Sequence, residues 1–112
     1  MSTFTIHTAD TAPADSKPLL AKSQSAFGMV PNLHAVMAES APLLDGYQQL
    51  HALAQQTAFD AEELTVVWQA INVEHNCHYC VPAHTGIAHS MKVSAEVIDA
   101  ILNYEFSSVL EH

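Results

Sequence analysis

The stretch of residues 74–84, Glu-His-Asn-Cys-His-Tyr-Cys-Val-Pro-Ala-His, constrains this chain more than any other part of it. It holds both cysteines of the chain, Cys77 and Cys80, as a C-x-x-C pair, and His84 follows four residues after the second cysteine. If the stretch is helical, these three side chains lie at positions i, i+3 and i+7, and that spacing places them on one face of the helix. Two thiols and an imidazole on one face are typical of redox or metal chemistry rather than of core packing.

Signals for the beginnings and ends of helices surround this stretch. Small polar residues ahead of proline or glutamate predict helix starts, and glycine or asparagine after an apolar run predicts helix ends. The helices that these signals predict span about residues 16–27, 31–40, 41–56, 60–75, 78–91 and from 94 onward. Because no alternating strand pattern survives inspection, the sequence predicts an all-α fold.

The helix ends beside the cysteines have the clearest signals. Asp60 followed by Glu63 has the spacing of a capping box, and Asn76 is typical of a helix end. Pro82 has no backbone N–H, so it either lies in the first turns of the motif helix or kinks that helix. In both cases the cysteines lie at or near a helix N-terminus. Since such an end and a nearby histidine favour the thiolate, we expect a lowered pKa for one of the two thiols.

Length and charge limit the function classes. A chain of 112 residues that is 49% hydrophobic is expected to form one domain with a real core. Three Lys and Arg against twelve Asp and Glu give a formal net charge of -9, which excludes a phosphate-binding surface for nucleic acid and disfavours an anionic membrane surface. With no apolar run near the roughly 20 residues of a membrane span and no visible secretory signal, we expect a cytoplasmic protein. There a C-x-x-C pair is typically catalytic or metal-binding.

The chain is expected to divide into three parts. Residues 1–14 are rich in Thr and Ala and are predicted to form an extended N-terminal arm. Residues 15–109 are predicted to form the single all-α domain. Residues 110–112, Leu-Glu-His, resemble the start of an expression tag and are left out of the functional prediction. Short apolar helices in so small a chain also favour a homo-oligomer, whose contacts would cover the remaining apolar surface.

The residues themselves predict a redox cycle. His84 lies one turn from Cys80 and is placed to act as base during attack and as acid for the leaving group. We expect Cys80 to attack an O–O bond or a disulfide, Cys77 to resolve the product as an internal disulfide, and an external dithiol to reduce that disulfide.

Two other interpretations of the cysteines remain open. They could be small buried residues without chemistry. They could also be half of a zinc site, completed by His84 and one of His75, His78 and His89, although structural zinc normally takes four ligands from two such motifs.

The pattern Asn76, Cys77, Tyr79, Cys80 and His84 resembles the alkylhydroperoxidase AhpD and carboxymuconolactone decarboxylase-like superfamily, and within it the peroxidase-related branch. The resemblance covers about residues 60–103, with looser agreement over residues 27–32. It implies an AhpD-like helical bundle, a homo-oligomer and a cofactor-free, metal-free thiol peroxidase in antioxidant defence. It also implies a peroxide substrate and a dithiol reductant of the thioredoxin-like or lipoyl type. In such a site Cys80 is the peroxidatic thiol, Cys77 the resolving thiol and His84 the relay histidine.

The chain departs from this pattern at one position. The family relay includes a glutamate twelve residues before the first cysteine, and Thr65 stands there instead. Glu74, three residues before Cys77, is the predicted replacement, and Glu62 or Glu63 are the other candidates.

Two alternative functions follow from this departure and from the resemblance. The first is a redox-sensing or scaffold module without catalysis, which the missing glutamate favours. The second is a lactone decarboxylase, which would need basic residues for an anionic diacid and has only three Lys and Arg to draw on.

Overall fold

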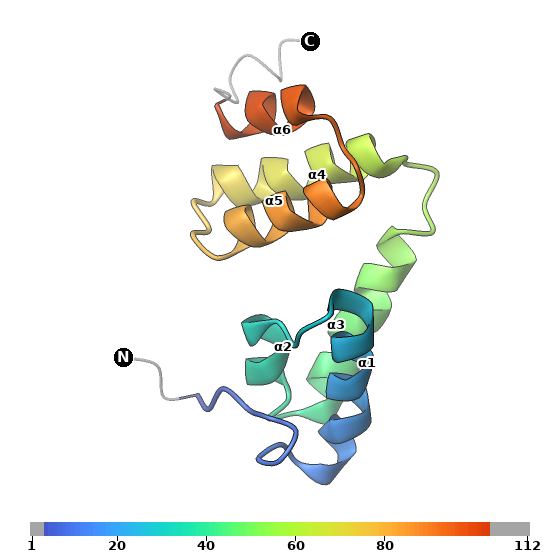
Figure 1. Ribbon diagram of the computed structural model, residues 1–112, viewed down its shortest axis with the longest axis vertical. Helices are drawn as coiled ribbons and strands as arrows, with labels where there is room; N and C mark the ends of the chain where they lie inside the picture. The colour runs from blue at the N-terminus through green and yellow to red at the C-terminus, as the bar shows by residue number, and fades with distance from the viewer. Residues whose placement is uncertain (1–3, 104–112) are drawn as a thin grey trace. The chain divides into compact units, whose positions relative to one another are not determined.

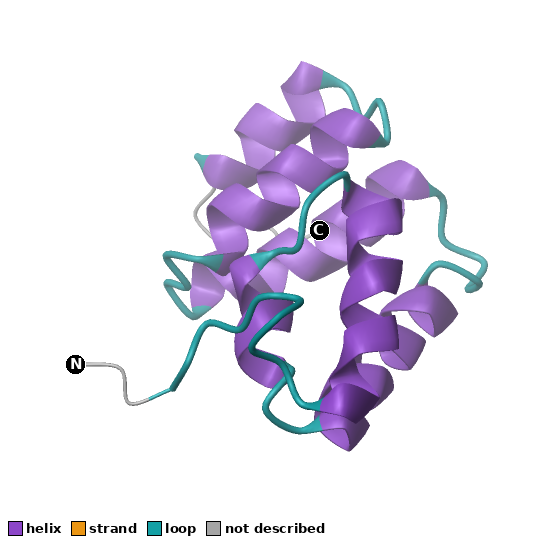
Figure 2. Cartoon of the chain, turned by 60° about the horizontal axis from the view of Figure 1, so that its bottom comes forward, coloured by secondary structure: helices purple, strands orange, loops and turns teal. Residues whose placement is uncertain are grey.

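The structure, a computed structural model, describes residues 4–103, and in that range it is built of helices with no strand (Figures 1 and 2). The prediction of an all-α fold is confirmed for these residues. The elements are, in order, a 3-10 helix η1 (Ala14–Ser16) and the α-helices α1 (Lys17–Phe27), α2 (Asn32–Met37), α3 (Ala41–Ala54), α4 (Ala61–Glu74), α5 (Cys80–Ser90) and α6 (Ala95–Leu102). None of the helices in this range is both long and apolar enough to cross a membrane. Residues 110–112, the predicted tag remnant, lie outside the described residues.

Contacts along the chain divide it into two compact units, residues 1–53 and 54–112. The division falls inside the predicted domain of residues 15–109. Each unit has its own buried apolar cluster, and each is described by itself.

Two predicted helix caps, at α4 and α6, form as expected, and one at α1 does not. The Asp60 carboxylate accepts the Glu63 N–H at 2.8 Å, and the Glu63 carboxylate accepts the Asp60 N–H at 3.1 Å, which completes the predicted capping box of α4. Ser94 Oγ caps α6 by accepting the Val97 N–H. Ser16 stands at the N-cap position of α1 but makes no capping bond. Its hydroxyl donates instead to a carbonyl of the α2–α3 turn.

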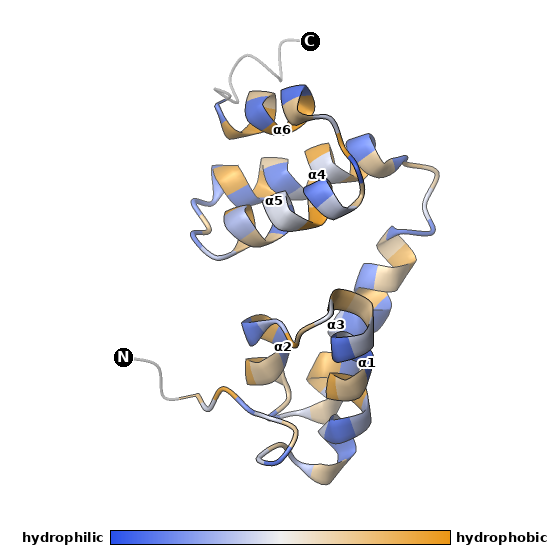
Figure 3. Cartoon of the chain, viewed as in Figure 1, coloured by the Kyte–Doolittle hydropathy of each residue, from blue (hydrophilic) through white to orange (hydrophobic). Residues whose placement is uncertain are grey.

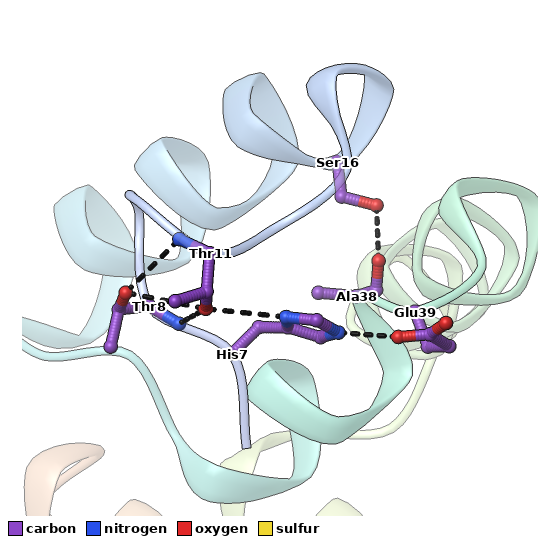
Figure 4. A network of polar contacts seen from close by, with 6 residues as sticks. All are labelled: His7, Thr8, Thr11, Ser16, Ala38 and Glu39. Atoms are coloured by element: carbon purple, nitrogen blue, oxygen red, sulfur yellow. Dashed lines mark hydrogen bonds and ion pairs between the residues drawn. The ribbon is translucent and has the colours of Figure 1, made fainter. Parts of the chain in front are cut away.

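In the first unit, the residues before η1 are tied to the end of α2. His7 donates its backbone N–H to the Ala35 carbonyl at 3.1 Å, and its ring bonds the carboxylate of Glu39. Ser16 Oγ donates to the Ala38 carbonyl (Figure 4). Ala12 is buried with Leu20, Ala38 and Leu44. The predicted arm of residues 1–14 therefore contributes to the core of this unit through Ala12.

A buried polar group lies between α1, α2 and α3. Ser23 Oγ lies 2.7 Å from His34 Nδ1, and Gln48 Nε2 donates to Ser23 Oγ at 2.8 Å and to the Leu19 carbonyl at 3.0 Å. The His34 ring makes edge contacts with Phe27 and Tyr47, and Tyr47 stacks on His51. Because both His34 and His51 are removed from water, they favour the neutral form.

The pH dependence of stability follows from these two histidines. Burial, and then the neighbouring His51, lower the pKa of His34 below its ordinary value of 6.5, and burial lowers the pKa of His51. Since the unfolded chain binds protons at these sites at a higher pH than the folded chain does, stability is complete above about pH 6.5 and falls as pH drops below it. We therefore expect the melting temperature to fall between about pH 7.5 and pH 5.

The His51→Gln variant is the control for this expectation, because it removes one of the two titrating rings. Its loss of melting temperature over the same pH range should be smaller than that of the unchanged chain. Equal losses in both proteins would assign the effect to other groups.

The second unit is formed by α4, α5 and α6, which pack against one another. Apolar and polar residues alternate along all three helices (Figure 3). One buried apolar cluster of this unit is formed by Ala88 of α5, Val93 of the linker after it and Ile98 of α6. The buried face of α4 is partly polar, because Thr65 and Gln69 are 1% and 2% exposed.

A left-handed residue ends α5 and turns the chain toward α6. Lys92 has φ 61°, the Lys92 N–H donates to the His89 carbonyl, and the Val93 N–H donates to the Ala88 carbonyl, each at 3.0 Å. This is the bond pattern of a Schellman motif, which normally has glycine at the left-handed position. The motif brings Val93 into contact with the apolar cluster, at the cost of an unfavourable backbone conformation for Lys92.

Replacing Lys92 with glycine should therefore stabilise the chain. We expect Lys92→Gly to raise the free energy of unfolding by about 0.5–1 kcal/mol, because glycine has no Cβ to clash in this conformation.

Gly28→Ala is the opposite test, since Gly28 ends α1 at φ 73° and an added Cβ would meet no atom within 4 Å. It should cost about 1 kcal/mol from backbone conformation alone. Urea denaturation measures both changes, and a destabilised Lys92→Gly chain would contradict this account of the turn.

Candidate functional site

The end of α4 fixes the backbone of Cys77. Asn76 is left-handed, with φ 51°, and its N–H donates to the Val73 carbonyl at 3.0 Å. The Cys77 N–H donates to the Asn72 carbonyl at 3.0 Å. These two bonds form a second Schellman motif, so Asn76 ends the helix as predicted and Cys77 is the first residue beyond the motif's left-handed position.

The two cysteines form a disulfide at the junction of α4 and α5. Their Cα atoms are 5.2 Å apart, and Cys80 is the first residue of α5. The Cys80 N–H donates to Cys77 Sγ at 3.0 Å. Both cysteines are partly buried, whereas Tyr79 between them is 43% exposed.

The expected continuous helical stripe of Cys77, Cys80 and His84 is wrong in one respect. Because the left-handed Asn76 breaks the helix and a turn follows it, Cys77 lies outside any helix, and α5 begins at Cys80 rather than at residue 78. Only Cys80 and His84 lie on a helix, at positions i and i+4 of α5. The prediction that the cysteines lie at or near a helix N-terminus is confirmed, and Pro82 lies in the first turn of α5, which continues to Ser90.

The imidazole of His84 lies against an aromatic ring of α4. The ring centroids of His84 and Trp68 are 5.1 Å apart, with the planes tilted by 54°. His84 is partly buried. Trp68 of α4 thus lies against one side of the His84 ring.

The position expected to carry the family glutamate has no acid function here. Thr65 is buried, and its hydroxyl donates to the Ala61 carbonyl of its own helix at 2.8 Å. Of the candidate replacements, Glu63 is engaged in the capping box of α4, and Glu62 is exposed in the first turn of that helix. Glu74 is exposed at the last residue of α4, two residues before the left-handed Asn76. Its role as a relay acid stays a prediction.

Gln69 is a site residue that the sequence prediction missed. Its Nε2 donates to the Val81 carbonyl at 3.1 Å and to Thr85 Oγ1 at 3.0 Å, and its Oε1 accepts from Asn72 Nδ2 at 3.0 Å. Val81 directly follows Cys80, so this amide ties the first turn of α5 to the middle of α4. The signal was the spacing: Thr65, Gln69 and Asn72 lie at i, i+4 and i+7, and therefore on one face of α4.

Metal-ligand geometry is absent from the described part of the chain. Within residues 4–103, no three His, Cys, Asp or Glu side chains gather in a group that could hold a metal ion. The alternative zinc site of Cys77, Cys80, His84 and a further histidine is therefore not assembled in this range.

Comparison with known proteins adds no assignment. No model of a protein family matches the chain, and no curated protein matches it significantly. The resemblance to the AhpD-like superfamily thus rests on the motif residues alone.

The role of the Gln69 amide can be tested by substitution. Gln69→Glu keeps the length of the side chain but replaces the donating amide with a carboxylate that cannot donate to the Val81 carbonyl when ionised. We expect a loss of about 2–3 kcal/mol in the free energy of unfolding, because a buried charge then faces a carbonyl oxygen. Gln69→Leu, which removes the bonds without adding charge, should cost less. Chemical denaturation of both variants measures the difference, and equal stability of Gln69→Glu and the unchanged chain would remove Gln69 from this role.

Proposed function

We propose that the chain is a thiol-dependent peroxidase and disulfide oxidoreductase that acts on alkyl hydroperoxides in antioxidant defence. One observation carries the proposal: Cys77 and Cys80 pair as a disulfide at the junction of two helices, and His84 follows one turn along the helix that Cys80 begins. In this proposal the chain is an AhpD-like protein of the peroxidase-related branch and works in the cytoplasm without a cofactor.

The proposed reaction has three steps. Cys80 thiolate attacks the terminal oxygen of the hydroperoxide, the O–O bond breaks, and the alkoxide leaves as the alcohol after taking a proton. Cys80 is then a sulfenic acid. Cys77 thiolate attacks its sulfur, which forms the Cys77–Cys80 disulfide and releases hydroxide as water after protonation. A dithiol reductant of the thioredoxin-like or lipoyl type returns both cysteines to thiols and becomes a disulfide itself.

His84 is the proposed proton carrier of the first step. In α5 it is one turn from Cys80, and side chains at i and i+4 are neighbours on a helix surface. A neutral imidazole in that position takes the Cys80 proton and returns it to the leaving alkoxide. Trp68 against the ring supports a fixed orientation of the imidazole. Glu74 is proposed to complete the relay in place of the missing family glutamate.

The proposal includes a homo-oligomer. Several large apolar residues of α3, namely Leu43, Leu50 and Leu53, are more than half exposed within a chain that is only 112 residues long. Surface of this kind supports contact with another copy.

A second candidate function has its own supporting observation. The buried Thr65 hydroxyl donates to the Ala61 carbonyl of its own helix, so no carboxylate occupies the usual relay position. A cysteine pair with an incomplete relay suits a redox-sensing module, which is oxidised once and not turned over. The two functions differ in turnover, which the following experiment measures.

Peroxide consumption by purified protein tests the proposal. With cumene hydroperoxide and dithiothreitol, we expect catalytic consumption by the unchanged chain and none by Cys80→Ser. Without dithiothreitol, Cys77→Ser should consume one equivalent and stop at a sulfenic acid that dimedone traps. His84→Gln should slow the reaction about 100-fold or more, as expected for loss of a general base.

His89→Gln is the matched control, because His89 is exposed on the last turn of the same helix. It should keep the full rate. Undiminished activity in Cys80→Ser would exclude the proposed peroxidase, and a single stoichiometric oxidation without turnover would assign the sensing function instead.

A further inference from the structure

We propose that the Cys77–Cys80 disulfide has a fixed polarity, in which the reducing thiol attacks Cys80 and Cys77 leaves as the thiolate. The proposal rests on the redox function proposed above, and it adds which of the two sulfurs the reductant attacks. It predicts that the mixed disulfide with the reductant forms mainly on Cys80.

The backbone donors at the start of α5 are the basis of this polarity. The Cys80 N–H points at Cys77 Sγ, with 3.0 Å between nitrogen and sulfur. The next N–H, that of Val81, donates to the Cys77 carbonyl at 3.1 Å, and that of Ala83 donates to the Tyr79 carbonyl at 3.2 Å. Pro82, between them, has no N–H to give. Among these backbone donors of the first turn, only the Cys80 N–H bonds a sulfur, and that sulfur belongs to Cys77.

A donor on one sulfur decides which sulfur leaves. In thiol–disulfide exchange the leaving sulfur takes up negative charge, and the thiol that holds that charge better leaves faster. A hydrogen bond to an ionised group is stronger than one to a neutral group, so the Cys80 N–H stabilises Cys77 more as a thiolate than as half of a disulfide. Attack at Cys80 therefore expels the stabilised thiolate, whereas attack at Cys77 would expel a Cys80 thiolate that lacks this donor.

The surrounding bonds hold the donor in place on both sides. Cys77 is fixed by its N–H bond to the Asn72 carbonyl at the end of α4. The first turn of α5 is fixed by Gln69, whose amide donates to the Val81 carbonyl. Because neither set of bonds involves a sulfur atom, both remain when the disulfide is reduced, and the N–H stays directed at Cys77.

The exchange balances as follows. The thiolate of the reductant forms a bond with Cys80 Sγ while the Cys77–Cys80 bond breaks, and Cys77 takes the electron pair. The second thiol of the reductant, as thiolate, then attacks the reductant sulfur that is bonded to Cys80, and Cys80 thiolate leaves. The reductant ends as a disulfide after giving up two electrons, and the two cysteines take up its two protons.

The first test uses reduced glutathione as the probe on the oxidised, full-length chain. Glutathione has one thiol and cannot close a disulfide of its own, so its mixed disulfide persists until Cys77 or a second glutathione displaces it. The reaction is quenched within seconds by acid, free thiols are alkylated with N-ethylmaleimide, and the peptide holding both cysteines is sequenced by mass spectrometry. We expect glutathione on Cys80 and N-ethylmaleimide on Cys77 in at least about nine of ten adducts, as a tenfold rate difference between the two attacks would give.

Denatured oxidised chain in guanidinium is the control, since it lacks the N–H bond. It should give comparable adducts on both cysteines. Adducts mainly on Cys77 in the folded chain, or the same distribution in folded and denatured chain, would overturn the polarity.

A second measurement uses the two single-cysteine variants. Cys80→Ser keeps the backbone N–H of position 80, so Cys77 keeps its donor, while Cys77→Ser leaves Cys80 without one. We expect the acid-dissociation constant of Cys77 in Cys80→Ser to be about tenfold larger than that of Cys80 in Cys77→Ser, from the thiolate absorbance near 240 nm against pH. The reverse order would overturn the proposal even if glutathione adducts were too short-lived to sequence.

Neither measurement involves a peroxide, so failure of the proposal can be told from failure of the peroxidase function. A chain that forms the Cys80 adduct but consumes no peroxide keeps the polarity and loses the peroxidase function. A chain that consumes peroxide but forms the Cys77 adduct loses the polarity alone.

Discussion

The left-handed turn at Asn76 is the constraint on which the cysteine site depends. By ending α4 with two backbone hydrogen bonds, it directs the chain out of the helix at Cys77 and allows α5 to begin three residues later. Had the helix continued through this point, the cysteines would share one face with His84, and the Cys80 N–H would bond a carbonyl four residues earlier instead of a sulfur. The break in the helix is therefore what gives the two sulfurs different surroundings.

The neighbourhood of the site is held by neutral polar groups instead of a carboxylate. Thr65 bonds its own helix, and Gln69 bridges α4 to α5 through one amide that donates twice and accepts once. A buried amide is neutral, so it needs no counter-charge and its hydrogen bonds do not change with pH. Because this amide bonds no sulfur atom, it holds the first turn of α5 in the same way in the oxidised and the reduced chain. This arrangement favours constant geometry over proton transfer on that side, and in the proposed cycle it leaves proton transfer to His84.

How far the sequence predicts this structure depends on the range of the interactions. The helices, the capping box of Asp60 and Glu63 and the stop at Asn76 are set by neighbours within four residues, and all were predictable. The start of α5 at Cys80 rather than at residue 78 was not predicted, because no side chain caps this end of the helix. The contacts of Gln69 with α5 and of His34 with Ser23 join residues 11 to 16 positions apart, and nothing in the local pattern names these partners. The spacing of Thr65, Gln69 and Asn72 marks one face of α4 as polar but does not identify what that face contacts.

The different surroundings of the two sulfurs suit a cysteine pair that acts in both directions, as the proposed cycle requires. In that cycle the thiol that meets the peroxide needs a base nearby during oxidation, and the helical spacing places His84 one turn from Cys80. During reduction, one sulfur must leave, and the backbone N–H favours departure of Cys77. If both aids served the same cysteine, an attacking reductant would expel the thiol that meets the peroxide and would stay bonded to the other cysteine. Dividing the aids between Cys77, three residues before α5, and Cys80, the first residue of α5, lets one short turn support both halves of the proposed cycle.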